Sequence, residues 1–102
     1  MLGVVLSPET QRRLCMLFKE QDRPDATRWL TEECGRNLPF CENSTPQSLE
    51  RIRFAALKLS AGDLMGLLEA IELAKADWRD LLMAAGFGED VRAHEFWIPN
   101  QV

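Results

Sequence analysis

The chain has 102 residues, of which 46% are hydrophobic, 27% charged and 8% aromatic, a balance typical of one globular domain over residues 1–102. Its net charge of -4 has the wrong sign for a protein that binds by neutralising phosphates, so no nucleic-acid partner is expected. No apolar run of about 18 residues could span a bilayer, and residues 1–6 lack a basic start, so we expect a cytoplasmic protein with no membrane association.

Helix signals begin close to the start of the chain. A serine, a proline and a glutamate at residues 7–9 combine a helix cap, a favoured first helical residue and an early negative charge. They predict a helix over 8–20. The spacing of apolar residues places Leu14 and Phe18 on its inward face and leaves Arg13 facing water.

A second, shorter helix and a long connection are predicted next. The helix begins at residue 24 or 25 and ends near 34, because Gly35 suits the left-handed conformation that ends many helices. The connection 35–45 is long for a compact protein, and connections of this length often cover a core or carry function. We expect Leu38 and Phe40 to tuck inward there.

Three more helices are predicted in the second half of the chain. The first covers 46–59 and opens on a threonine and a proline. Ser60 and Asp63 then have the S-x-x-D spacing of a capping box at the start of a fourth helix. Asp77 is expected to break that helix and to start a fifth, which Gly86 ends.

The tail, residues 93–99, contains three consecutive large apolar residues, Phe96, Trp97 and Ile98. In an extended tail alternate side chains point to opposite sides, so Phe96 and Ile98 would bury together and Trp97 would be available to a partner or a second copy. In a helical tail all three would share one apolar arc, and Trp97 would belong to the core. In either case the tail docks on this domain or on another chain, so these residues are candidate interaction residues.

The three cysteines have no C-x-x-C spacing and are predicted to be reduced thiols. Cys15 and Cys34 are expected to be buried apolar side chains, and Cys41 the least buried of the three. Together with His94 they contain the donors of a Cys3His zinc site, but the cysteine spacing does not fit, so neither a metal nor a cofactor is expected. A thiol enzyme using Cys41 and His94 remains an alternative.

Asp77 and Asp80 lie three residues apart, on adjoining parts of a helix surface. The favoured interpretations are helix capping, solvent exposure or an ion pair with Arg79. A less favoured interpretation is that they form a cation site or act in acid–base chemistry with His94. We keep both aspartates as candidate interaction residues. A carboxylate-dependent enzyme stays open beside the thiol enzyme.

Charge is unevenly distributed along the chain. Residues 60–90 hold seven acids and two bases, whereas residues 49–58 hold three bases and one acid. Mixed charge on neighbouring solvated helices is common, but an acidic surface can also steer a basic protein partner. The basic helix leaves a helix-turn-helix DNA-binding regulator as a third alternative.

These patterns together predict an all-α fold, a compact array or bundle of four to five short helices. The residues offer a poor inventory for catalysis, with one histidine, no tyrosine and no glycine-rich phosphate loop. We therefore interpret the chain as a small non-enzymatic protein-interaction or regulatory domain that binds a protein partner or associates with itself.

Overall fold

A computed structural model describes residues 6–35, 37–39, 41 and 44–99 of the chain. This part of the chain folds into four α-helices and two short 3-10 helices with no strand, which confirms the predicted all-α array. In chain order the elements are α1 (Pro8–Leu17), η1 (Glu20–Asp22), α2 (Arg23–Glu33), α3 (Pro46–Ser60), α4 (Leu64–Ala85) and η2 (Ala93–Phe96).

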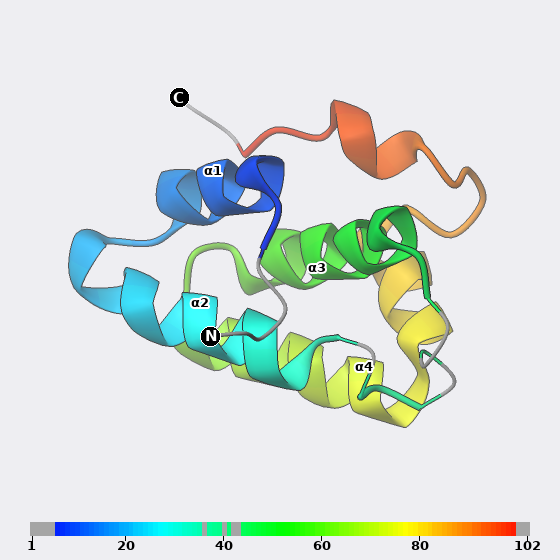
Figure 1. Ribbon diagram of the computed structural model, residues 1–102, viewed down its shortest axis with the longest axis horizontal. Coiled ribbons are helices and arrows are strands. Elements are labelled where there is room, and N and C mark those ends of the chain that lie inside the picture. Colours follow the sequence, from blue (N-terminus) through cyan, green and yellow to red (C-terminus); the bar gives the residue numbers. More distant parts are fainter. Residues whose placement is uncertain (1–5, 36, 40, 42–43, 100–102) are drawn as a thin grey trace.

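Helix α3 lies in the middle of the molecule, and together with α4 it supplies most of the buried hydrophobic residues. Figure 1 shows α1 and η2 on one side of α3, with α2 and the first part of α4 on the other. Four consecutive residues of α3, from Phe54 to Leu57, are buried, although only one face of an amphipathic helix usually is. A helix covered on several sides needs small residues where neighbours approach, and Ala55 and Ala56 supply them.

The first two helices depart from their predicted bounds. Ser7 caps α1 as predicted, since its side chain accepts a hydrogen bond from the Thr10 amide, but the helix ends at Leu17 and not at residue 20. Helix α2 begins at Arg23, one residue before its proline. The Arg23 side chain donates to carbonyl oxygens of Cys15 and Phe18, so it covers the end of α1 from the first residue of α2.

The turn between α3 and α4 is tightly packed against the end of α1. Ala61 and Gly62 both have positive φ, at 53° and 82°. A β-carbon on Gly62 would lie 2.5 Å from the carbonyl oxygen of Leu17, so only glycine fits there. Asp63, and not Ser60, is the residue that caps α4: its side chain accepts from the Gly66 amide, while Ser60 donates to the carbonyl of Leu57.

Helix α4 bends at Asp77, whose φ of -166° and ψ of 107° are extended, so the predicted break is present within one long element. Gly86 ends the helix with a φ of 83°, and the amide of Phe87 donates back to the carbonyl of Leu82. Phe87 is buried. No helix in the described ranges is long and apolar enough to cross a membrane.

The connection after α2 covers the core as expected at Leu38, which is 2% exposed. The second residue predicted to tuck inward, Phe40, lies outside the described residues. Cys41 follows and is also buried. The part of this connection that is described therefore closes one end of the helical array.

Candidate functional site

The tail turns alternate side chains to opposite sides, in the reverse of the assignment expected for an extended tail, and Trp97 packs against the core, as in the alternative. Trp97 has extended backbone angles after η2, and its ring makes edge contacts with Phe54 and Phe87 at centroid distances of 6.1 and 6.4 Å. Phe96 and Ile98 point outward and are 80% and 54% exposed. The expectation that these two would bury together is wrong, because Trp97 has the larger apolar surface and fills the space above α3.

Arg13 holds the tail against α1. Its Nε atom donates to the carbonyl oxygen of Trp97 at 2.8 Å and its guanidinium also reaches the carbonyl of Glu95. A further bond of 2.7 Å joins it to the carboxylate of Glu9, and the group lies over the ring of Phe54. The prediction that Arg13 faces water is wrong, since it is only 4% exposed. Apart from Glu9, its partners come from segments far away in sequence, which the helical spacing of α1 does not reveal.

One side of Arg13 borders an apolar groove between α1 and the tail. Arg12, Arg13, Met16 and Ile98 line this groove, which has a volume of about 290 Å³. Met16 is 41% exposed and Ile98 is 54% exposed, so apolar surface is open to solvent on both of its walls. We call Met16, Phe96 and Ile98 the tail face.

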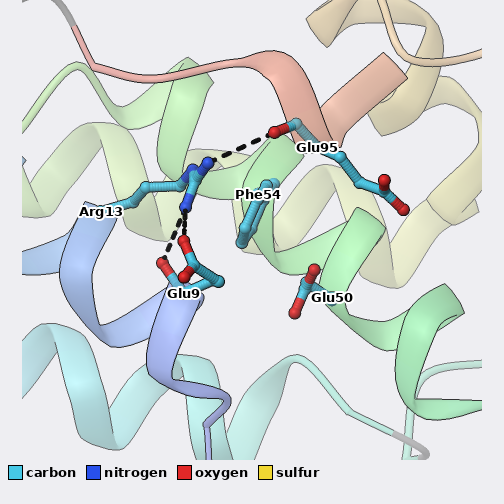
Figure 2. Close-up of a pocket in the computed structure, with 5 residues that line it drawn as sticks. All are labelled: Glu9, Arg13, Glu50, Phe54 and Glu95. Carbon is cyan, nitrogen blue, oxygen red and sulfur yellow. Dashed lines mark hydrogen bonds and ion pairs between the residues drawn. The ribbon is translucent and has the colours of Figure 1, made fainter. Parts of the chain in front are cut away.

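The other side of Arg13 borders a polar cleft of about 250 Å³. Figure 2 shows its lining residues, which come from α1 (Glu9 and Arg13), α3 (Glu50 and Phe54) and η2 (Glu95). The Glu9 carboxylate pairs with Arg13, and the ion pair lowers the pKa of Glu9. The Glu95 carboxylate points away from Arg13 in Figure 2 and pairs with Arg92 at 2.9 Å.

Glu50 and the only histidine meet beside this cleft. One carboxylate oxygen of Glu50 accepts a hydrogen bond of 2.8 Å from Ser7, and the other lies 3.7 Å from Nε2 of His94. His94 is fully buried, with its ring edge-on to Phe54. Burial lowers the pKa of His94 more than the nearby Glu50 and Glu95 raise it, and Arg51 lowers it further, so the ring is neutral at pH 7.

Neither ring nitrogen of His94 forms a hydrogen bond within the described part of the chain. The backbone of Val91 approaches the ring and favours its charged form, but without the geometry of a hydrogen bond. Buried polar atoms normally have a partner. His94 is therefore the buried polar group of this region that most clearly lacks hydrogen-bond partners.

The predicted aspartate pair lies away from these features, at the bend of α4. Asp77 accepts from the Arg79 amide and from its guanidinium, and these hydrogen bonds lower the pKa of Asp77. Asp80 is exposed. Nε2 of His94 lies 3.7 Å from Glu50, and neither aspartate is among the ion-pair contacts of His94 in the described part of the chain. The geometry fits the expectation that Asp77 caps the start of a helical segment.

The cysteines differ from expectation in their burial. Cys41 is 1% exposed and Cys34 is fully buried, whereas Cys15 is exposed, so the expected order is wrong for Cys15 and Cys41. Burial raises the pKa of Cys34 to about 12, which keeps it a thiol. No group of three histidine, cysteine, aspartate or glutamate side chains in the described ranges is arranged to hold a metal ion.

The basic residues of α3 donate hydrogen bonds to carbonyl groups at the ends of neighbouring helices. Arg51 donates to the carbonyl of Phe87, Arg53 to that of Cys34 and Lys58 to that of Ala85. Cations are favoured at these positions because the carbonyl groups at the end of a helix carry partial negative charge. These three groups are thus engaged with backbone and do not form an outward basic face.

The sequence pattern pointed to the tail residues but not to the roles of Arg13 and Glu50 or to the cleft between them. One local signal was present, since Glu9 and Arg13 have the i,i+4 spacing of a helical ion pair. No local signal exists for Glu50, whose partners Ser7 and His94 are each more than 40 residues away in sequence.

Comparisons with known proteins add no relative: no family model matches the chain, and neither a curated protein nor a solved structure matches it.

Proposed function

We propose that this protein is a non-enzymatic interaction domain that binds another protein through the tail face. The observation that carries the proposal is the exposure of Phe96, which is 80% exposed. An exposed aromatic side chain on an ordered segment loses little conformational freedom when it is buried by a partner, and aromatic residues are enriched at binding hot spots.

The segment that presents Phe96 and Ile98 is held on both sides. Trp97 anchors it to the core, and the Arg13 guanidinium binds the carbonyl oxygens before and after Phe96. The apolar groove lies beside it, between Met16 and Ile98. Exposed apolar side chains beside an apolar groove are typical of a protein-binding site.

A cytoplasmic location belongs to the same proposal, supported by three cysteines of which none is joined in a disulfide. The thiol-enzyme alternative has lost its main support, because Cys41 is buried. The DNA-binding alternative has lost the basic face on which it depended, because the cations of α3 bind backbone carbonyls.

The test is a comparison of three tagged proteins in the source cell: the unaltered chain, the double variant Phe96→Ser/Ile98→Ser, and Met83→Ser as control. Met83 is 63% exposed on α4 and is not a residue of the tail face. A partner captured by the unaltered chain and by the control, but not by the double variant, is identified and its binding measured with purified proteins. Equal capture by all three would contradict the proposal.

Self-association is tested in the same set by sedimentation at increasing concentration. An assembly that dissociates only in the double variant identifies a second copy as the partner. Because each copy carries a net charge of -4, we expect such an assembly to be weaker at low salt than at high salt.

A further inference from the structure

Glu50 lines the polar cleft without a cationic partner, and the fully buried His94 behind it has no hydrogen bond within the described part of the chain. The Glu50 side chain is 24% exposed, accepts a hydrogen bond from Ser7 and forms no ion pair with lysine or arginine in the described ranges. His94, at 3.7 Å, is neutral at pH 7 and cannot supply the missing positive charge. A carboxylate withdrawn from water without a cation is costly, and so is a buried ring with no hydrogen bond.

The other carboxylates of the cleft are already compensated. Glu9 is paired with Arg13 at 2.7 Å and with Arg12 at 3.5 Å, and Glu95 is paired with Arg92. The carboxylate of the cleft without a cationic partner is thus Glu50. Carboxylate oxygens accept strong, charge-assisted hydrogen bonds from a cationic donor.

We propose that the polar cleft receives the ammonium or guanidinium group of a lysine or arginine side chain that a protein partner presents to Glu50. This inference rests on the proposed function. Arg13 lines both the cleft and the apolar groove, so the two are adjacent. The same partner segment places an apolar side chain in the groove between Met16 and Ile98.

The dimensions and surroundings of the cleft fit this occupant. Its volume of about 250 Å³ accommodates the end of one long side chain. Phe54 forms an apolar wall against which the methylene groups of a lysine or arginine can pack. One face of the Phe54 ring is already covered by Arg13, so the incoming cation is bound by Glu50 and not by the ring.

The experiment uses peptides, because the partner is not identified. A displayed library of random peptides is selected on the full chain, and a recovered peptide is synthesised with its basic residue and with norleucine in its place. Both are titrated against the unaltered protein and against Glu50→Gln, Glu72→Gln and Phe96→Ser/Ile98→Ser. Glu72 is the matched control, an α4 glutamate that is 63% exposed.

We expect the selected peptides to carry a basic residue beside a large apolar one. Replacement by norleucine should weaken binding about tenfold or more, the scale of a charge-assisted contact removed from water. Glu50→Gln should abolish that preference and Glu72→Gln should retain it. Phe96→Ser/Ile98→Ser should weaken both peptides alike. Circular dichroism of each variant verifies that it remains folded.

The possible failures are separable. Peptides that need Phe96 and Ile98 but show no basic residue, or whose preference survives Glu50→Gln, overturn the cation site and leave the proposed function standing. Peptides that bind equally to the double variant overturn the proposed function. If n-butylamine alone binds at Glu50 as tightly as the basic peptide, the ligand is a small amine and the inference of a protein partner is overturned.

Discussion

The α3–α4 pair and the face formed by α1 and the tail use their charged residues in different ways. In the α3–α4 pair, Arg51 and Lys58 donate to carbonyl groups at the end of α4, and no carboxylate is drawn into the contact. On the α1 and tail face, one buried arginine serves both the tail carbonyls and a carboxylate, and Glu50 remains without a cation. In the first region Arg51 and Lys58 are bound to backbone carbonyls, whereas the second contains the carboxylate on which the proposed cation site rests.

The largest expected effect tests whether the tail belongs to the core. Trp97→Ala should lower the free energy of unfolding by about 3 kcal/mol, since it removes a large half-buried ring from contact with Phe54 and Phe87. Phe96→Ala, one residue earlier but exposed, should change it by less than about 0.5 kcal/mol. Urea denaturation of both variants measures the difference. Equal losses would mean that Phe96 is buried in solution.

The next effect concerns the α3–α4 turn. Gly62 and Gly86 both have positive φ, which costs an L-residue about 1 to 2 kcal/mol, but only at Gly62 would a β-carbon meet backbone. Gly62→Ala should therefore destabilise by more than about 2 kcal/mol and Gly86→Ala by about 1 kcal/mol. Thermal unfolding of the two variants is the measurement. A smaller loss of stability in Gly62→Ala would show that the end of α1 can move away from the new β-carbon at little cost in free energy.

A moderate effect is expected on the pH dependence of stability, which should originate in the α1 and tail face. Because burial holds the pKa of His94 below its ordinary value of 6.5, the unfolded chain binds a proton that the folded chain does not. Stability should thus fall as the pH is lowered from 7 through 6.5, with a slope of at most about 1.4 kcal/mol per pH unit. His94→Gln should flatten this slope between pH 7 and 5.5. A slope that survives the substitution would assign it to other groups.

The smallest effect compares two surface cations. Lys58→Met removes a hydrogen bond of 2.8 Å to the carbonyl of Ala85 and should cost about 0.5 to 1 kcal/mol. Arg79→Met removes an exposed ion pair with Asp77 and should leave the melting temperature unchanged. Parallel melting curves measure both. If Arg79→Met proves as costly as Lys58→Met, the bend at Asp77 depends on that ion pair.

The sequence predicted the helices better than the site. Caps such as Ser7 and Gly86 and the break at Asp77 are local, so their residues determine them within one helical turn. The two sides of the tail and the burial of Arg13 depend on which surface lies opposite, a long-range property. For the same reason the partners of Glu50 were not predictable, because Ser7 and His94 reach it only after folding.

The bend at Asp77 also determines how α4 fits within the dimensions of the molecule. A straight helix of the 22 residues of α4 would measure about 33 Å, as long as the largest dimension of the protein, 32 Å. The bend instead turns the last part of α4 toward one end of α3 (Figure 1), and Leu81 and Leu82 of that part are buried. Insertion of one residue before Asp77 would rotate everything after it by about 100° about the helix axis and carry both leucines out of the core.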